Sequence, residues 1–287
     1  MVSIIIINYN QRDLVSECVK SIENNIHSDY EILIVNNTPE QDLRHLEEIA
    51  TVIPNANKGF SEANNLAAKE AKGEYLFFLN ADTVVKNDSL KGAVEILDKE
   101  KVGAVGMKMY NADGTFQLSF WKENTFGNEK INKGSEAKFR QRDKEFIRKI
   151  ENEHSTVSKV DWVSGAAMLI KKDVFKEIGG FDENFFLFYE DADLCKRLKD
   201  KGYKIVFYPG SYITHYKGEN VNEEFTGKTY FYAKKSQLLY YEKHNDLRDR
   251  VFLRIYLTVK FSFKYLISFK SINLKIFLLT IGLRKSP

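Results

Sequence analysis

The amino-terminal part of the chain alternates short apolar runs with stretches whose apolar residues recur at helical spacing. The apolar runs lie at 4–7, 31–35, 51–53 and 75–79, and the helical stretches lie at 14–22 and 61–71. Continuous β-branched runs are typical of parallel strands that are covered on both faces. Strands that alternate with helices predict an α/β domain.

Polar residues directly follow three of these predicted strands, at 8–10, 36–38 and 80–82. In parallel α/β sheets, ligands bind in the crevice beyond the carboxyl ends of the strands. Residues 1–110 are therefore predicted to form a nucleotide-binding half. Each cluster alone also fits an ordinary solvated loop, so the ligand-binding interpretation depends on all three meeting at one edge.

The middle of the chain is less regular. Residues 117–159 are rich in charge and are predicted to be an insertion or a mobile loop, with a helix at 137–151. The apolar pattern returns at 160–170, which predicts a strand interrupted at Ser164 and Gly165.

A helix and a strand are predicted next. The helix covers 190–201, and on it Asp191 lies on the apolar, inward stripe whereas Asp193 does not. The strand covers 203–208 and is ended by the Pro-Gly pair that follows it. His215 is then expected in the loop beyond this strand.

Residues 246–287 are predicted to form a basic, aromatic-rich helical tail. From Val251 onward the chain carries seven Lys or Arg and no acidic residue. No apolar run approaches the roughly 18 to 20 residues that cross a bilayer. Two interpretations stay open: a helix lying on an anionic membrane surface, or an appendage packed on its own domain or on a second subunit.

Composition narrows the class of protein. The 43 Lys and Arg nearly balance the 40 Asp and Glu, which argues against a nucleic-acid partner. Hydrophobic residues make up 43% of the chain, which excludes wholesale disorder. Cys18 and Cys195 have no metal-ligand spacing and are expected to be reduced core thiols. The amino terminus has no secretion signal, so we expect a cytoplasmic protein.

Two groups of acidic residues are candidates for chemistry. Asp82 directly follows a buried strand, where a carboxylate suits a divalent cation that faces phosphate oxygens. Asn80 either adds a carbonyl oxygen to that site or only caps the loop. The acids at 190–193 either interact with the helix dipole or include a general base, for which Asp191 is the candidate.

Two further features are weaker signals. His215 is either a third metal ligand or an ordinary loop imidazole. The loop at 55–61 contains Gly59 and opens a helix, which suits close approach by a diphosphate. It matches neither a P-loop nor Gly-x-Gly-x-x-Gly, which argues against an ATPase and a nicotinamide dehydrogenase.

Taken together, these segments resemble the family 2 glycosyltransferases with a GT-A fold, especially their rhamnosyltransferase-like branch. The segments that carry the resemblance are SIIIINYN at 3–10, NANKGF at 55–60, NAD at 80–82, DWVSGA at 161–166, GGFD at 179–182 and EDADLC at 190–195. The resemblance covers about residues 1–245. It implies a Rossmann-like, mainly parallel mixed sheet flanked by helices, with a C-terminal helical appendage. Residues 1–110 would be the nucleotide-binding half and residues 160–220 the acceptor and catalytic half.

The resemblance also implies site residues. The donor site would include Asn8, Tyr9, Asn36, Asn57, Gly59, Asn65 and Ala81. The acceptor site would include Trp162, Ser164 and Gly165, with Trp162 either stacking on a sugar or packing in the core. Asp82, His215 and Asn80 would hold Mn²⁺ or Mg²⁺. Asp191 would deprotonate the acceptor hydroxyl, and Glu190 would orient the acceptor or the base.

The implied reaction is an inverting, metal-dependent transfer of one sugar from a nucleotide donor to a glycan or lipid-linked glycan. The implied place is the cytoplasm, with peripheral contact at the inner face of the membrane. Two positions differ from the usual family pattern, because Asn36 and Asn80 stand where Asp is common. These differences leave open a catalytically silent nucleotide-sugar or glycan-binding module with the same fold. A metal phosphohydrolase would need a denser cluster of carboxylates.

Overall fold

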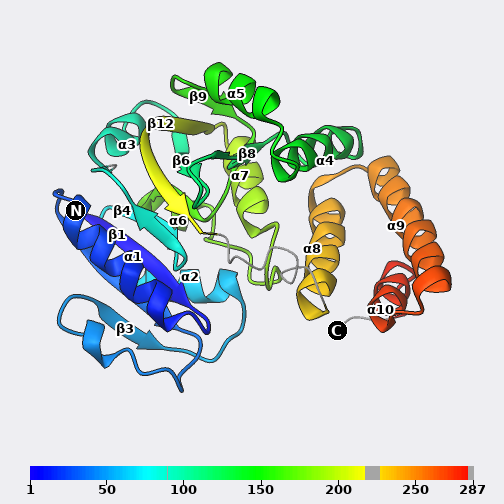
Figure 1. Ribbon diagram of the computed structural model, residues 1–287, viewed down its shortest axis with the longest axis horizontal. Helices are drawn as coiled ribbons and strands as arrows, with labels where there is room; N and C mark the ends of the chain where they lie inside the picture. Colours follow the sequence, from blue (N-terminus) through cyan, green and yellow to red (C-terminus); the bar gives the residue numbers. More distant parts are fainter. Residues whose placement is uncertain (89, 217–226, 284–287) are drawn as a thin grey trace.

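The computed structural model describes residues 1–88, 90–216 and 227–283. Parts of the predicted catalytic half (217–220) and of the predicted tail (284–287) lie outside the described residues. Figure 1 shows an α/β body that contains the N-terminus, and a separate group of three C-terminal helices beside it.

The body is built on a sheet in the order β3-β2-β1-β4-β11-β6-β12-β5. Its parallel strands are β1 (Val2–Asn8), β2 (Tyr30–Asn36), β3 (Thr51–Pro54), β4 (Tyr75–Asn80), β6 (Val102–Tyr110) and β12 (Lys204–His215). The antiparallel strands are β11 (Ala167–Lys171), between β4 and β6, and β5 (Thr83–Val85), next to β12. The predicted mainly parallel mixed sheet is confirmed.

Helices cover both faces of this sheet. Ile4 and Ile6 of β1 pack with α1 (Arg12–Asn25) and α3 (Leu90–Leu97), whereas Ile5 packs on the other face. That second face is covered by α2 (Phe60–Glu70), α6 (Lys172–Glu177) and α7 (Glu190–Asp200). Successive strand side chains point to opposite faces, so the continuous apolar run of β1 matches a sheet buried on both sides. Cys18 and Cys195 are buried free thiols in these two clusters.

The predicted single helix at 137–151 is wrong. The chain forms α4 (Phe126–Arg140) and α5 (Lys144–Glu153), separated by a turn in which Arg142 has a φ of 58°. The Asp143 side chain accepts a hydrogen bond from the Phe146 N–H and so caps α5. The segment predicted as an insertion or mobile loop therefore folds as two capped helices, together with the short strands β7 (Phe116–Gln117), β8 (Phe120–Trp121) and β9 (Ser158–Val160).

The predicted end of the strand at the Pro-Gly pair is also wrong. Strand β12 continues to His215 and absorbs the pair in an irregularity between Tyr208, which pairs with Met107, and Tyr212, which pairs with Lys108. A bulge lets a strand carry residues that do not join the ladder. His215 is consequently the last residue of a strand paired on both sides, instead of a loop residue.

The interruption expected at Ser164 and Gly165 is present. It separates β10 (Trp162–Val163), which pairs with β8, from β11 in the main sheet.

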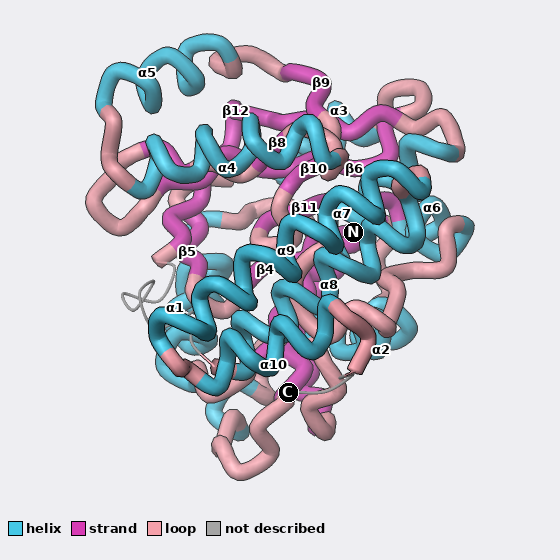
Figure 2. The backbone as a smooth tube through the Cα atoms, turned by 90° about the vertical axis from the view of Figure 1, so that its right-hand side faces the viewer, coloured by secondary structure: helices cyan, strands magenta, loops and turns pink. Residues whose placement is uncertain are grey.

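Helices α8 (Lys228–His244), α9 (Leu247–Ser268) and α10 (Ser271–Thr280) pack together, and Figure 2 shows them as neighbours in front of the sheet. Leu253, Leu257 and Phe261, on one side of α9, share a buried cluster with α8, α10 and Phe185. Within the described ranges, no helix combines the length and apolar character needed to cross a membrane. Through the buried cluster described above, α9 and α10 pack on α8 of the same chain.

Candidate active site

Three of the predicted site residues meet at the carboxyl ends of neighbouring strands. In the strand register, Asn8 of β1 lies opposite Asn36 of β2, and Ile7 lies opposite Asn80 of β4. Ala81 follows and is buried in the core. The sheet therefore brings the three predicted polar clusters to one edge, where α/β folds bind their ligands.

The amides of Asn8 and Asn36 bind each other. Asn8 Nδ2 donates to Asn36 Oδ1 at 2.8 Å, and Asn36 Oδ1 also accepts from the Thr38 N–H. Asn36 Nδ2 donates to the Gln41 carbonyl at 3.1 Å. These bonds hold the loops after β1 and β2 together, whereas the Tyr9 side chain is 54% exposed. A role for Asn36 in base recognition stays a prediction.

The Asn57–Gly59 loop packs against the segment that precedes α7. Gly59 has a φ of 115°, and a Cβ added there would lie 2.6 Å from the Phe186 carbonyl oxygen. The Phe60 N–H donates to the same oxygen at 2.8 Å, and Asn57 Oδ1 accepts from the Gly59 N–H. The group that approaches the Gly59 backbone closely is thus the Phe186 carbonyl of the same chain, and a side chain at position 59 would block it. Contact of this loop with a diphosphate stays a prediction.

Asn65 anchors the turn that follows α6. Its Oδ1 accepts from the Phe181 N–H at 2.9 Å, and its Nδ2 donates to the Phe181 carbonyl at 2.8 Å. This side chain fixes the turn that precedes the catalytic helix candidate. Any direct contact of Asn65 with a donor stays a prediction.

Asp82 and His215 form a buried pair. Asp82 Oδ1 lies 3.1 Å from His215 Nε2, and the other ring nitrogen lies 2.9 Å from Gln117 Oε1. The pair exists because β12 continues to His215 and the Tyr216 N–H donates to the Asp82 carbonyl. A carboxylate oxygen and an imidazole nitrogen that face each other fit a divalent cation such as Mn²⁺. No group of three His, Cys, Asp or Glu that could hold a metal occurs among the described residues.

A short path of hydrogen bonds connects the Asp82 segment to Asp191. The Asn80 N–H donates to the Ala166 carbonyl at 2.9 Å, and the adjacent Gly165 N–H donates to Asp191 Oδ2 at 3.0 Å. Asp191 is partly exposed, and burial of its carboxyl raises its pKa, while hydrogen bonds from the Gly165 and Ala192 N–H groups partly offset that effect. The two predicted functional carboxylates therefore flank the same end of the β4–β11 pair.

Glu190 is a buried acid beside Asp191. Only 6% of its surface is exposed, and among the described residues its Oε2 has no hydrogen-bond partner. Burial, followed by the charge of Asp191, raises the pKa of Glu190 well above its usual value. The two preceding residues, Phe188 and Tyr189, both have a φ of 67°. Left-handed backbone at non-glycine residues is costly and is typical of functional sites, as is a buried polar atom without a partner.

Asp193, predicted to lie off the inward stripe of the helix, is nevertheless a buried residue. It is fully buried against α8, where its carboxylate contacts Arg197 at 2.7 Å, Lys243 at 2.6 Å and His244 at 2.7 Å. The helix is packed on more than one side, so a position off the apolar stripe is not exposed. Asp193 is a structural carboxylate that joins α7 to α8.

The predicted acceptor residues lie on β10 and directly after it. The Trp162 ring stacks on Trp121 with centroids 4.2 Å apart, and its Nε1 donates to the Lys122 carbonyl at 3.0 Å. The Ser164 N–H donates to the Ser119 carbonyl, and Gly165 contacts Asp191 as described. These bonds place the 164–165 segment beside the catalytic carboxylate candidate. Stacking of Trp162 on a sugar stays a prediction.

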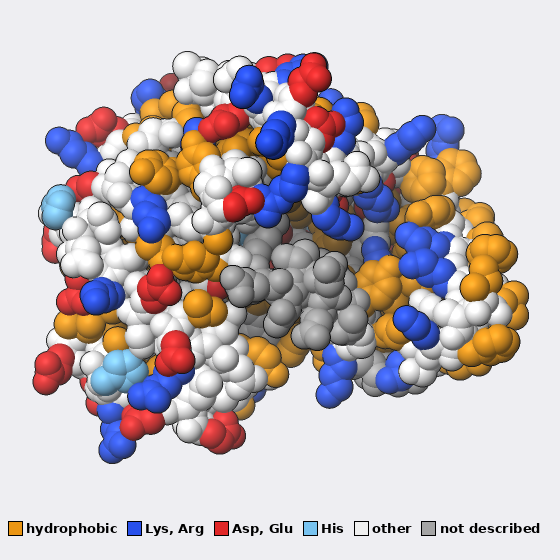
Figure 3. Space-filling view, viewed as in Figure 1, with side chains coloured by type: hydrophobic (Ala, Val, Ile, Leu, Met, Phe, Trp, Pro, Cys, Tyr) orange, Lys and Arg blue, Asp and Glu red, His pale blue; other side chains and the backbone are white. Residues whose placement is uncertain are grey.

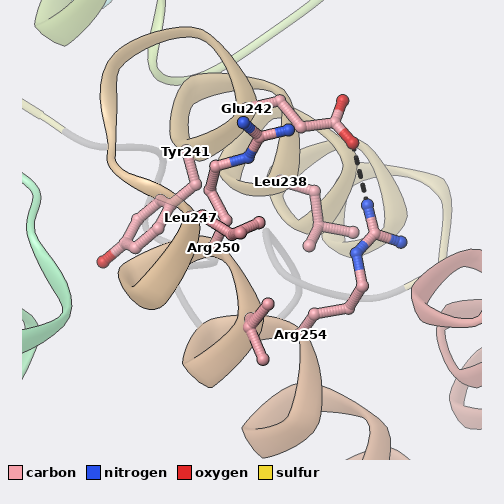
Figure 4. Close-up of a pocket in the computed structure, with 7 residues that line it drawn as sticks. Leu238, Tyr241, Glu242, Leu247, Arg250 and Arg254 are labelled. Atoms are coloured by element: carbon pink, nitrogen blue, oxygen red, sulfur yellow. Dashed lines mark hydrogen bonds and ion pairs between the residues drawn. The ribbon is translucent and has the colours of Figure 1, made fainter.

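A pocket elsewhere is too small to be this site. It is lined by Leu238, Tyr241, Glu242, Leu247, Arg250, Val251 and Arg254 between α8 and α9, as Figure 4 shows for its labelled residues. Its volume is about 120 Å³, whereas drug-sized ligands occupy pockets of roughly 300 to 1,000 Å³. The Glu242–Arg254 ion pair, at 2.9 Å, closes one side of it.

Solved structures share this fold. The crystal structure of GalNAc-T7 with UDP, GalNAc and Mn²⁺ superimposes with a TM-score of 0.60 at 15% identity, covering 84% of this chain and 47% of that one. Mannosyltransferase PcManGT from Pyrobaculum calidifontis in complex with GDP-Man and Mn²⁺ gives a TM-score of 0.59 at 19% identity, covering 84% and 63%. The fold is the GT-A fold.

The family model described as glycosyl transferase family 2 matches residues 3–179, more than half of the chain, so the protein belongs to this family. A second model, the N-terminal domain of galactosyltransferase, matches residues 143–219. The predicted membership is confirmed.

Curated relatives confirm the likeness to the rhamnosyltransferase-like branch. The chain is 26% identical to rhamnosyltransferase WbbL of Escherichia coli (strain K12), over 89% of this chain and 98% of WbbL. It is 28% identical to N-acetylglucosaminyl-diphospho-decaprenol L-rhamnosyltransferase of Mycobacterium tuberculosis, over 37% of each chain. It is 29% identical to O-antigen biosynthesis protein RfbC of Myxococcus xanthus, over 75% of this chain but 17% of RfbC.

Proposed function

We propose that this glycosyltransferase moves one sugar from a nucleotide-sugar donor to a hydroxyl of a glycan or lipid-linked glycan, with inversion at the anomeric carbon. The observation that supports the proposal most is the short path from the Asp82–His215 pair through Asn80, Ala166 and Gly165 to Asp191. A leaving diphosphate and an incoming hydroxyl need charge stabilisation and proton removal at nearby positions.

Each acidic residue has a separate role in this proposal. Asp191 accepts the proton of the attacking hydroxyl, and the Gly165 N–H fixes the direction of its carboxylate. Glu190, a buried acid whose pKa is raised by burial, orients the acceptor through its otherwise unpartnered oxygen. Asp82 and His215 would hold Mn²⁺ or Mg²⁺, which when bound offsets the negative charge on the leaving diphosphate.

The names of the relatives support the proposed substrates. A rhamnosyltransferase, an O-antigen biosynthesis protein and an enzyme acting on a diphospho-decaprenol acceptor all match this chain. We therefore propose a role in cell-envelope polysaccharide synthesis, with a rhamnosyl or other hexosyl donor. A panel of nucleotide sugars, assayed for metal-dependent release of nucleoside diphosphate, identifies the donor. NMR of the product then determines the anomeric configuration, and retained configuration would refute the displacement mechanism.

Replacing Asp82 with Ala is expected to lower transfer by about 10²-fold, because it removes a carboxylate from the metal site. Chelation of divalent cations by EDTA is expected to have a similar effect, reversed by added Mn²⁺. The measurement is the rate of nucleoside diphosphate release at saturating donor. Full activity of Asp82→Ala in EDTA would exclude the proposed metal site.

The hydrogen bond from Asn8 Nδ2 to Asn36 Oδ1, which occupies the Asn36 oxygen, favours one alternative, a catalytically silent nucleotide-sugar or glycan-binding module. Calorimetry with nucleoside diphosphates, with and without Mn²⁺, separates the two functions. Metal-dependent binding followed by donor turnover supports the enzyme. Binding without turnover in the presence of any acceptor supports the module.

We also propose that α9 contacts an anionic membrane surface. Its outer side exposes a row of apolar side chains: Phe252, Ile255, Val259, Phe263, Leu266 and Ile267. Val251, Ile255 and Val259 also line a groove of about 440 Å³ between α9 and α10. Figure 3 shows hydrophobic and basic side chains gathered at this edge of the molecule. Apolar side chains flanked by Lys and Arg are typical of helices at a lipid interface.

Charge favours lipid over a second copy of the chain as the partner. From Val251 onward there is no acidic residue to pair with Lys260, Lys264 or Lys270. Two copies that met through the same face would bring these cations together without counter-charges. Anionic lipids supply the missing charge, and each Lys or Arg near the surface contributes about 1 kcal/mol.

The double variant Phe263→Asp/Leu266→Asp is expected to lose binding to phosphatidylglycerol-containing vesicles, as measured by co-sedimentation. Both side chains are 64% exposed, so the fold should tolerate the change. Ile49→Asp is the matched control, because Ile49 is 41% exposed outside the C-terminal helices and its variant should still bind. If the double variant binds vesicles as well as the unmodified chain, the exposed side of α9 is not the lipid-binding surface. If light scattering shows a dimer that the double variant abolishes and Ile49→Asp does not, this side of α9 is a self-association surface.

A further inference from the structure

A chain of hydrogen bonds begins in the turn between β6 and β7 and ends at the ring of His215. In the turn, the Asp113 carboxylate accepts from Thr115 Oγ1 at 2.7 Å and from the Thr115 N–H at 3.1 Å. Thr115 Oγ1 in turn accepts from Asn111 Nδ2 at 2.9 Å, and the Thr115 carbonyl accepts from the same nitrogen at 3.3 Å. Hydrogen bonds from Thr115 lower the pKa of Asp113, so this carboxylate is ionised at neutral pH and only accepts.

The acceptor at the turn fixes the direction of every later bond. Because Asn111 Nδ2 faces Thr115, Asn111 Oδ1 faces Gln117 and accepts from Gln117 Nε2 at 2.8 Å. Gln117 Oε1 is then the atom that faces His215 Nδ1, at 2.9 Å. An amide oxygen cannot donate, so His215 Nδ1 carries a proton.

The other ring nitrogen of His215 is thereby directed at Asp82. In a neutral imidazole with its proton on Nδ1, Nε2 carries a lone pair, and here Nε2 lies 3.1 Å from Asp82 Oδ1. A lone pair and a carboxylate oxygen that face each other are suited to a shared cation. Outer partners that fix the tautomer of a histidine ligand are a general feature of metal sites.

The surrounding sheet holds this arrangement in place. Gln117 is 2% exposed and His215 is 7% exposed. Gln117 of β7 pairs with Met109 of β6, and β6 also pairs with β12, which ends at His215. Buried side chains on adjacent paired strands have few alternative rotamers, so the contact between Gln117 and His215 is held in place.

We propose that Gln117 and Asn111 are positioning residues, which present Nε2 of His215 to a divalent cation shared with Asp82. This inference rests on the metal-dependent function proposed above. It assigns a role to two residues that lie outside the predicted site.

The test measures Mn²⁺ binding to the full chain by the loss of the free-Mn²⁺ electron paramagnetic resonance signal, with and without UDP. Gln117→Leu removes the acceptor for Nδ1 and is expected to weaken Mn²⁺ binding by about 10- to 100-fold. Asn111→Leu leaves Gln117 in place but frees its amide to turn, and is expected to weaken binding in the same direction. Asn111 is only partly buried, so Asn111→Leu keeps the test available if Gln117→Leu fails to fold.

The double variant Asn111→Leu/Gln117→Glu is the decisive rescue. A glutamate at 117 has two accepting oxygens and needs no partner to orient it, so Mn²⁺ affinity is expected to recover. A double variant that binds as weakly as Asn111→Leu, or a folded Gln117→Leu that binds as tightly as the unmodified chain, would overturn the inference. Asp82→Ala and His215→Ala test the metal site itself: if these two bind Mn²⁺ normally, the metal-dependent function fails and not only the positioning role.

Discussion

Asp191→Asn is expected to lower the rate of sugar transfer by about 10²- to 10⁴-fold, which is the usual contribution of a general base. The substitution keeps the side-chain shape and retains an oxygen that can accept from the Gly165 N–H, which Asp191 binds at 3.0 Å. The lost property is the ability to take a proton from the acceptor hydroxyl. The measurement is a single-turnover rate with saturating donor and acceptor, together with the affinity for nucleoside diphosphate, which should stay nearly unchanged.

Glu190→Gln is the matched control for this prediction. Burial raises the pKa of Glu190 well above its usual value, and Gln keeps the shape of this side chain and its capacity to form hydrogen bonds. A loss below about tenfold is expected, because a neutral hydrogen-bonding group remains in place. If Glu190→Gln silenced the enzyme while Asp191→Asn did not, the two roles would have to be exchanged.

Asp193→Ala is expected to lower the free energy of unfolding by about 3 to 5 kcal/mol, as is typical when one partner is removed from a buried ion pair. The variant leaves Arg197, Lys243 and His244 without the carboxylate that they surround. It also removes a contact between α7 and α8, so the position of Asp191 on α7 depends on it indirectly. Urea denaturation followed by circular dichroism measures the change.

Asp200→Ala is the control on the same helix. Asp200 contacts Lys196 with its side chain 54% exposed, and exposed pairs typically contribute about 0 to 1 kcal/mol. Equal losses in Asp193→Ala and Asp200→Ala would contradict the structural role of Asp193.

Acidification provides an independent check on Asp193. Burial alone would raise its pKa, but the His244 hydrogen bond and the charge of Arg197 outweigh burial and lower the pKa below its ordinary value of 3.8. A lowered folded-state pKa contributes stability above the unfolded value, and that stability is lost as pH falls through the folded value. The difference between the unmodified chain and Asp193→Ala should therefore shrink only below about pH 4.

The sequence contained enough information for the parallel half of the fold. Continuous apolar strands at 4–7 and 75–79 can be buried only on both faces, and their polar ends then meet at one edge of the sheet. The motifs around Asp82 and Asp191 could also be located, because a strand end and a helix start are local features. The hydrogen bonds of Ala166 and Gly165, which join the two segments, are seen only in the structure.

Other features depend on contacts between distant segments, which leave no local pattern. Strand β12 continues through Pro209 because its pairing with β6 outweighs the local turn signal. Asp193 is buried because α8 packs on a side of α7 that the helical stripe does not reveal. The hydrogen bond between Gln117 and His215 joins residues 98 positions apart, so no spacing in the sequence could indicate it.

The sequence by itself thus determined the alternation of strands and helices, the edge of the sheet at which polar groups gather, and the family to which the chain belongs. These follow from local periodicity and from short motifs. Only the tertiary structure decided which acid is exposed for chemistry and which is held in an ion-pair cluster, and which nitrogen of His215 faces Asp82. Burial and hydrogen-bond direction are set by neighbours that are distant along the chain and adjacent in space.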